Sequence, residues 1–237
     1  MSYPNLDLLE RAAAMLQPLL PEIVFVGGCA TGLLITDPGA AAVRGTYDVD
    51  VITEIASYAD YVVFSERLRE LGFQEDSREG APLCRWQQGD LVLDVMPLDA
   101  EILGFSNRWY ADALRTSAAV LLPGGLTIRA ITAPYFLATK FEAFRGRGLG
   151  DYFASHDLED FVAVIDGRTS ILREVQEASP DLRNFIGEAV RTLLAAPRFL
   201  DALPGYLPPD PASQARIGRL SQTLNELTRP LPDLEPS

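Results

Sequence analysis

Short β-branched or alternating apolar runs separate the helical patterns in the first half of the chain. In the second half, apolar residues recur at helical spacing over long stretches. A period of two is typical of strands, and a spacing of three to four is typical of helices with one buried face. The pattern predicts strands at residues 23–26, 48–53, 72–75, 84–88, 91–98 and 127–131, and helices at 6–20, 29–35, 59–71, 134–147, 157–165, 171–178, 182–203 and 212–227.

The change of pattern near residue 132 predicts a boundary between two domains. Residues 1–132 mix helices with strands, residues 133–228 are helical, and residues 229–237, with three prolines, form a tail. Within the first domain, Gly89-Asp90 joins two predicted strands closely enough to indicate a hairpin. The predicted fold class is therefore α+β, with a C-terminal helical domain.

The composition indicates a folded protein with a substantial core: of 237 residues, 48% are apolar and 22% are charged. Two cysteines exclude a disulfide framework. The longest uncharged apolar stretch, residues 23–36, is shorter than the roughly 18–20 residues that span a bilayer, so no membrane helix or membrane partner is expected. The N-terminus lacks the features of a secretory signal, so we expect a cytoplasmic protein. A net charge of −13 disfavours broad, non-specific binding of nucleic acid.

Three acidic residues on predicted strands are candidates for a metal site. Asp48 and Asp50 lie two positions apart, so they share one face of a strand, and Asp94 is the single acid in an otherwise apolar strand. Clustered carboxylates without His or Cys favour Mg²⁺ or Mn²⁺. If the two strands are neighbours, the acids stand close enough for phosphoryl chemistry with two metals. An exposed strand face, or a core Asp held by backbone N–H groups, would explain the same residues without a metal.

A glycine pair, Gly27-Gly28, ends one predicted strand and precedes a predicted helix. Free N–H groups at such a helix start can bind phosphate, although two glycines alone are a weak signal. Cys29, next to them, is interpreted as a small packed residue rather than a reactive thiol.

Lys140 is the only lysine in the chain and borders the apolar stripe of the helix at 134–147, with Arg147 on the same flank. In the next helix, Asp157 points toward the core and is a candidate to orient Lys140. The alternatives are an exposed lysine that packs only its stem, and an Asp157 that caps its own helix. His156, the only histidine, supports no metal site or catalytic triad.

Together these motifs resemble the DNA polymerase β-like nucleotidyltransferase superfamily, and most closely its AbiEii/AbiGii-type members, many of which are toxins of toxin–antitoxin pairs. The resemblance covers residues 25–168. It rests on Val26-Gly-Gly-Cys-Ala-Thr-Gly, Arg44-Gly-Thr-Tyr-Asp-Val-Asp-Val, Leu137-Ala-Thr-Lys-Phe-Glu-Ala-Phe-Arg and His156-Asp-Leu-Glu-Asp. It implies a mixed-sheet nucleotidyltransferase domain followed by a helical domain, with the nucleotide between them.

The resemblance also implies a role for each matching residue. Gly27 and Gly28 would hold the triphosphate; Asp48, Asp50 and Asp94 would bind Mg²⁺ or Mn²⁺, and Asp94 would help to deprotonate the acceptor. Lys140 would contact the nucleotide phosphate, with Asp157 positioning it.

The sequence departs from the family pattern at two positions. Cys29 stands where many members have serine, so Thr31 would have to supply that contact to phosphate. Tyr47 stands where a basic residue would help, which leaves Arg44 as the nearest substitute. These departures weaken the case for fast turnover.

The expected function is Mg²⁺-dependent transfer of a nucleotidyl group from an NTP to an acceptor hydroxyl, with release of pyrophosphate. For toxin members the resemblance implies tRNA or another RNA as acceptor and a cognate antitoxin as partner. Two alternatives stay open: a metal-dependent phosphohydrolase that uses water as the nucleophile, and a nucleotide-binding module with little or no turnover.

Overall fold

The computed structural model describes residues 5–55, 57–104, 106–148 and 150–229. The chain divides into two compact units, one of residues 1–33 and 42–139 and the other of residues 34–41 and 140–237. The predicted domain boundary at residue 132 lies just before α6 (Ala133–Arg147), whereas the two units divide within that helix, after residue 139. Residues 34–41, predicted to belong to the first domain, are part of the second unit. Of the predicted tail, only Arg229 lies within the described residues.

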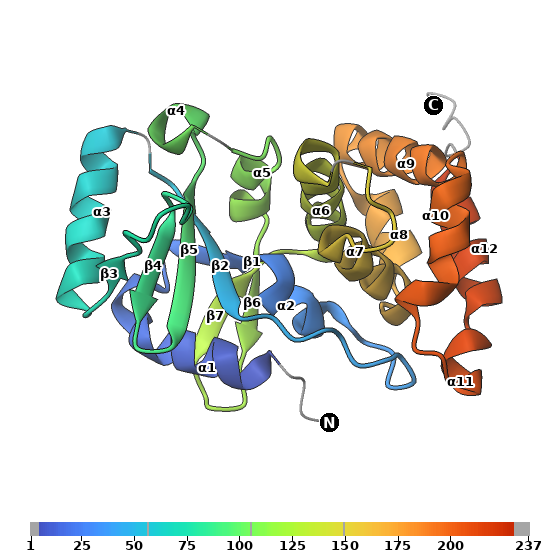
Figure 1. The fold of residues 1–237 in the computed structure, drawn as a ribbon, viewed down its shortest axis with the longest axis horizontal. Coiled ribbons are helices and arrows are strands. Elements are labelled where there is room, and N and C mark those ends of the chain that lie inside the picture. The colour runs from blue at the N-terminus through green and yellow to red at the C-terminus, as the bar shows by residue number, and fades with distance from the viewer. Residues whose placement is uncertain (1–4, 56, 105, 149, 230–237) are drawn as a thin grey trace, which may run out of the picture. The chain divides into compact units, whose positions relative to one another are not determined.

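The first unit contains a mixed sheet, which among the described residues has seven strands in the order β3-β4-β5-β2-β1-β7-β6 (Figure 1). Two neighbouring pairs, β2 with β5 and β1 with β7, are parallel, and the other pairs are antiparallel. This confirms the predicted mixture of helices and strands. The strands are β1 (Ile23–Val26), β2 (Asp48–Thr53), β3 (Gln74–Glu75), β4 (Arg85–Gln88), β5 (Leu91–Pro97), β6 (Ala118–Leu121) and β7 (Thr127–Ala130).

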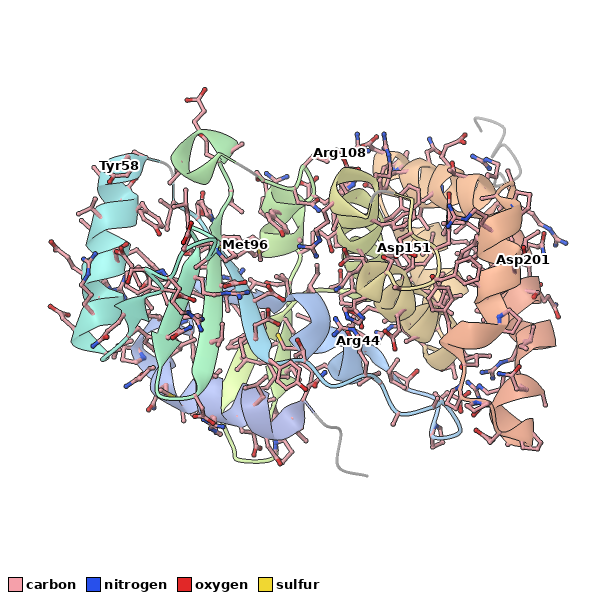
Figure 2. The ribbon with its side chains drawn as sticks, in the orientation of Figure 1. Arg44, Tyr58, Met96, Arg108, Asp151 and Asp201 are labelled. Carbon is pink, nitrogen blue, oxygen red and sulfur yellow. The ribbon has the colours of Figure 1, made fainter. Side chains whose placement is uncertain are left out.

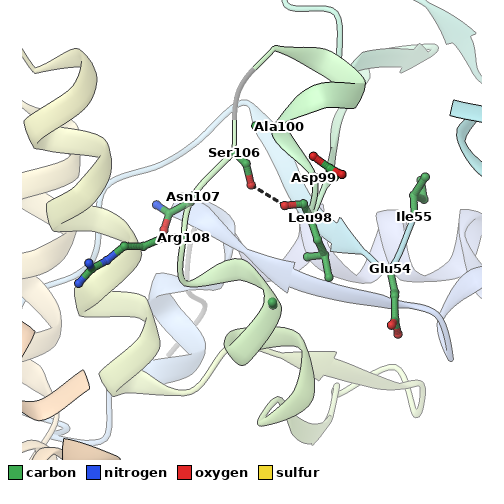
Figure 3. A pocket seen from close by; sticks show the side chains of 9 residues that line it. Glu54, Ile55, Leu98, Asp99, Ala100, Ser106, Asn107 and Arg108 are labelled. Carbon is green, nitrogen blue, oxygen red and sulfur yellow. Dashed lines mark hydrogen bonds between the residues drawn. The ribbon is translucent and has the colours of Figure 1, made fainter. Parts of the chain in front are cut away.

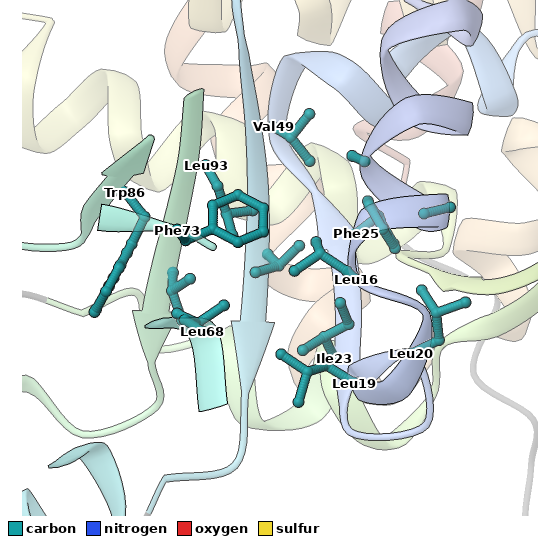
Figure 4. Close-up of a cluster of buried hydrophobic side chains, with 14 of the residues drawn as sticks. Leu16, Leu19, Leu20, Ile23, Phe25, Val49, Leu68, Phe73, Trp86 and Leu93 are labelled. Atoms are coloured by element: carbon teal, nitrogen blue, oxygen red, sulfur yellow. The ribbon is translucent and has the colours of Figure 1, made fainter. Parts of the chain in front are cut away.

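One face of the sheet carries the apolar core of this unit, shown in Figure 4. Val49 and Val51 of β2 and Leu93 of β5 pack in one buried cluster with Leu16, which follows the first helix, and Leu68 of the third. Because side chains alternate along a strand, Asp50, which stands between these two valines, lies on the opposite face of the sheet. The helices that begin in this unit are α1 (Leu6–Met15), α2 (Gly27–Leu34), α3 (Tyr58–Glu70), α4 (Ala100–Leu103), α5 (Tyr110–Arg115) and α6 (Ala133–Arg147).

In its described part, the second unit is built from helices and the segment 34–41. Phe141 of α6 packs against Phe161 and Phe185, with ring centroids 6.4 and 5.9 Å away. Asp37 joins the segment to the start of the last helix through Arg216, the residue before that helix, and through Arg219 within it, each at 2.9 Å. The remaining helices are α7 (His156–Gly167), α8 (Ile171–Glu177), α9 (Pro180–Leu194), α10 (Pro197–Ala202), α11 (Pro211–Gln214) and α12 (Ile217–Leu227).

Three of the predicted helices were too long. The helix predicted at residues 6–20 ends at Met15 and is followed by a 3₁₀ turn at Gln17–Leu19. The helix predicted at residues 182–203 is broken into α9 and α10, because Pro197 has no N–H to continue the ladder and holds Ala196 in an extended conformation. The helix predicted at 212–227 is likewise divided into α11 and α12. The pattern also missed α4, α5 and β6; β6 is largely exposed and lacks the alternation that identifies a strand.

Among the described residues, none of the helices combines the length and apolar character needed to span a membrane.

Candidate functional site

Three carboxylates lie together on the face of the sheet opposite the apolar core. β2 and β5 are parallel neighbours, and their register places Asp50 directly beside Asp94. Asp48 lies two residues before Asp50 and therefore on the same face. Asp48 and Asp50 are half-buried, whereas Asp94 is only 7% exposed. The sequence could only suppose that these two strands are adjacent, and the structure places them so.

Arg85 of β4 is the partner of the buried Asp94. Its Nε and one terminal nitrogen donate to the two oxygens of Asp94 at 2.8 and 2.7 Å, a bidentate ion pair. The same terminal nitrogen donates to Asp48 at 3.2 Å. The hydrogen bonds to Asp94 raise the pKa of Arg85 further above its ordinary value. A guanidinium thus bridges two of the three acids predicted to bind a metal.

Our sequence analysis missed Arg85, although the signal was present. The hairpin predicted around Gly89-Asp90 pairs residues outward from the turn, so that Arg85 stands opposite Asp94. Directly opposite residues of an antiparallel pair share a face. A single acid in an apolar strand, with an arginine at the matching position of its hairpin partner, therefore predicts an ion pair.

In this structure Arg85 is the cation that lies between Asp48 and Asp94. Both oxygens of Asp94 accept hydrogen bonds from Arg85, and the described residues contain no group of three or more His, Cys, Asp or Glu side chains placed to hold a metal ion. In this structure Arg85 neutralises Asp94, and the joint binding of Mg²⁺ or Mn²⁺ by Asp48, Asp50 and Asp94 stays a prediction.

Asp50 lies against the first residue of α2. Gly27 has φ +66°, and the Asp50 carboxylate is closer than 3.0 Å to the position that a Cβ on Gly27 would take. Only glycine fits here, both for its backbone conformation and for lack of space. The structure thus brings Asp50 to the helix end at which Gly27 and Gly28 were predicted to bind phosphate.

A buried asparagine holds this helix end to the loop before β2. Asn5 is 1% exposed, and its Nδ2 donates to the carbonyls of Gly28 and Arg44, both at 3.1 Å. Its Oδ1 accepts from the N–H of Thr46 at 3.0 Å, and the Thr46 hydroxyl donates to Asp48 at 2.7 Å. This chain of contacts positions both the glycines and Asp48, and our sequence analysis did not identify Asn5 as part of the site.

The other residues predicted to contact nucleotide differ in accessibility. Gly28 is buried, and Arg44, labelled in Figure 2, is partly exposed. Thr31 is fully buried, and among the described residues its hydroxyl has no hydrogen-bond partner, so a nucleotide cannot reach it in this structure. Cys29 is buried and its thiol donates to the carbonyl of Val26 at 3.1 Å, in keeping with a packed residue.

Lys140 lies in a separate buried cluster in the second unit. Its Nζ is 2.6 Å from Asp160 and 3.3 Å from Asp157, and Arg147 also donates to Asp157, at 2.9 and 3.0 Å. Burial raises the pKa of Asp157, but the hydrogen bond from Arg147 and the charge of Lys140 outweigh it and bring the pKa below its ordinary value. With Lys140 only 6% exposed, the alternative of an exposed lysine is excluded. Asp160 is its nearer partner, whereas the sequence analysis proposed Asp157 as the acid that orients it.

An open pocket of about 680 Å³ lies beyond the carboxyl ends of β2 and β5 (Figure 3). Glu54, Asp99 and Arg108 are among its lining residues, and the Ser106 hydroxyl donates to the carbonyl of Leu98 at 2.8 Å beside it. None of the predicted site residues lines this pocket.

No protein-family model matches the chain, and no curated protein matches it. Among solved structures, the chain is similar to the antibiotic-resistance factor ANT(2'')-Ia, with 16% identity, 82% of this chain and 95% of that chain covered, and a TM-score of 0.45. It is also similar to JHP933 from Helicobacter pylori, with 13% identity, 96% of this chain and 93% of that chain covered, and a TM-score of 0.48. A nucleotidyltransferase candidate from H. pylori is similar with 11% identity, 96% of each chain covered and a TM-score of 0.47. At these identities and TM-scores the likeness carries no argument about function, which has to come from the residues of the site.

Proposed function

We propose that this protein is a nucleotidyltransferase that transfers a nucleotidyl group from an NTP to an acceptor hydroxyl. The observation that carries the proposal is the meeting of Asp50 with the start of α2, beside Asp48 and Asp94 on one sheet face. Carboxylates next to a helix N-terminus combine a group that accepts a proton with one that binds phosphate.

In the proposed reaction, the acceptor oxygen forms a bond to the α-phosphorus, and the bond from that phosphorus to the bridging oxygen breaks, which releases pyrophosphate. The N–H groups of the first turn of α2 bind the phosphates, since the positive end of the helix dipole favours anions. Asp50 accepts the proton of the acceptor hydroxyl, and Asn5 positions the helix end and the loop that leads to Asp48.

A divalent ion, Mg²⁺ or Mn²⁺, belongs to this proposal only through Asp48 and Asp50, because Arg85 holds Asp94. The role of Lys140 as a phosphate-binding lysine and of Asp157 as its positioning acid rests on the sequence resemblance alone, because in this structure Lys140 is buried and paired with Asp157 and Asp160. The AbiEii/AbiGii-type assignment, tRNA or another RNA as acceptor, a cognate antitoxin and a cytoplasmic location rest on the sequence resemblance alone.

The test is to incubate the protein with Mn²⁺ or Mg²⁺, each of the four α-labelled NTPs in turn, and total RNA or cell extract. We expect one NTP to label an acceptor and to release an equal amount of pyrophosphate. Asp50→Asn should lower this rate by roughly 10²–10⁴-fold, the usual contribution of a general base.

The matched control is Asp90→Asn, which removes one exposed carboxylate from the turn between β4 and β5 and should leave the rate unchanged. If no NTP labels any acceptor and no pyrophosphate appears, the proposal fails. Phosphate or nucleoside monophosphate released without a labelled acceptor would instead identify the phosphohydrolase.

A second candidate function is favoured by Arg85. Because its guanidinium neutralises Asp94, the third carboxylate that the resemblance assigns to the metal site is engaged elsewhere, as in a nucleotide-binding module without turnover. Equilibrium dialysis that detects NTP binding, together with no pyrophosphate under the conditions above, would support this candidate over the first.

A further inference from the structure

The ion pair between Arg85 and Asp94 carries an inference about which cation the acidic face uses. Asp94 is 7% exposed, and a carboxylate so far from water needs a strong partner. Arg85 meets this need through two hydrogen bonds of 2.7 and 2.8 Å in the planar fork geometry that suits a carboxylate.

The position of Arg85 is built into the sheet. β4 and β5 pair in antiparallel register, with Arg85 opposite Asp94, and Trp86, the next residue of β4, is fully buried in the core on the other face. The register of the strand therefore keeps Arg85 on the same face of the sheet as the acids as long as Trp86 stays in the core. A third hydrogen bond, 3.2 Å long, joins the same guanidinium to Asp48, so one side chain contacts two of the three acids.

We propose that Arg85 is the resident cation of this face and a positioning residue for its acids, and that it excludes Asp94 from metal coordination. A divalent ion then binds through Asp48 and Asp50 alone. Arg85 holds Asp94 by two hydrogen bonds of 2.7 and 2.8 Å but Asp48 by a single one of 3.2 Å, so the repulsion between the guanidinium and a metal ion is strongest at Asp94. This inference rests on the proposed function only in that it takes Asp48 and Asp50 as the metal-binding pair.

The test is a titration of Mn²⁺ without nucleotide, followed by the electron paramagnetic resonance of free Mn²⁺. Four proteins are compared: the wild type, Arg85→Gln, the double variant Arg85→Gln/Asp94→Asn, and the control Arg69→Gln. Arg69 is a half-exposed arginine of α3 that pairs with Glu75, so its loss changes the net charge by the same amount.

We expect Arg85→Gln to bind Mn²⁺ at least tenfold more tightly than the wild type, because Asp94 becomes a ligand. The double variant should bind no more weakly than the wild type, because Asp94 is a ligand in neither. Arg69→Gln should stay within about twofold of the wild type.

The inference is overturned if Arg85→Gln binds no more tightly than the wild type, or if no variant binds Mn²⁺. It is equally overturned if the double variant binds at least tenfold more weakly, since Asp94 would then be a wild-type ligand. Arg85→Gln leaves the buried Asp94 without its ion-pair partner and could fail to fold for that reason. The double variant replaces the ion pair with two neutral amides, and in that case its affinity for Mn²⁺ alone tests the inference. The Mn²⁺ titration does not depend on turnover, so a protein that transfers no nucleotidyl group would still show whether Asp94 can bind the metal.

Discussion

The carboxylate of Asp50 lies where a side chain on Gly27 would begin, although the two residues are on different elements of the fold. Gly27 opens α2 with a positive φ of 66°, and Asp50 is in the middle of β2. Antiparallel pairing of β1 with β2 creates the contact, because it sets Val26, the residue before Gly27, beside Asp50. The helix start and the acidic pair are therefore one structural unit.

Gly27→Ala should destabilise the protein and disrupt the acidic face. The left-handed backbone alone costs an alanine about 1–2 kcal/mol, and displacement of Asp50 should add at least about 1 kcal/mol. Urea unfolding provides the measurement. The matched control is Gly80→Ala, since Gly80 also has a positive φ, 83°, but nothing within 4 Å of its Cβ position. Equal losses for the two variants would contradict the close contact with Asp50.

Asn5→Ala should destabilise the protein by about 1–3 kcal/mol, because it removes the partner of the buried Gly28 carbonyl, of the part-buried Arg44 carbonyl and of the Thr46 N–H. Since Asn5 connects Gly28 to the loop before Asp48, NTP binding should weaken as well. Unfolding and NTP dialysis on the same sample measure both effects. Asn225→Ala, which removes an exposed asparagine bonded to its own helix, should change neither by a measurable amount.

Lys140→Met should cost about 3–5 kcal/mol, because it leaves Asp160 and Asp157 buried near each other with less positive charge. Replacing Asp160 with Asn in the same protein should recover part of this loss. The control is Arg145→Met on the same helix, where an exposed pair with Glu142 at 3.7 Å should contribute less than about 1 kcal/mol. Thermal unfolding measures all three variants. A tolerated Lys140→Met would show that the cluster is not neutralised by this lysine.

Acid should destabilise the second unit through Asp37. The N–H of Gly39, followed by Arg219 and Arg216, lowers the pKa of Asp37 from 3.8 to about 2. A carboxyl group with a lower pKa in the folded state adds stability above its unfolded pKa and loses it as the pH falls. The loss should therefore run from about pH 4 to about pH 2. Urea unfolding at several pH values in this range should show that the free energy of unfolding of Asp37→Asn falls less with decreasing pH than that of the wild type. An equal fall in both proteins would contradict the prediction.

The alternation and spacing of apolar residues determined most of the elements. The strands at 23–26 and 48–53 agree with the prediction to the residue, because β-branched runs and an acid–valine alternation leave few other conformations. The hairpin of β4 and β5 was predictable from Gly89-Asp90. The break between α9 and α10 was harder to predict from the sequence, because Pro197 lies within an otherwise continuous helical pattern of apolar residues.

For the site, the sequence by itself determined that Asp48 and Asp50 share a face, since this depends only on the period of a strand. Only the tertiary structure decided that β5 lies beside β2, that Asp50 fills the space at Gly27, and that Asn5 links the helix end to the loop. These contacts join residues far apart in the chain, and local patterns hold no information about such distances. The same reason applies to the charge of the site: whether an acid meets a metal or Arg85 depends on the strand next to it, which the fold selects.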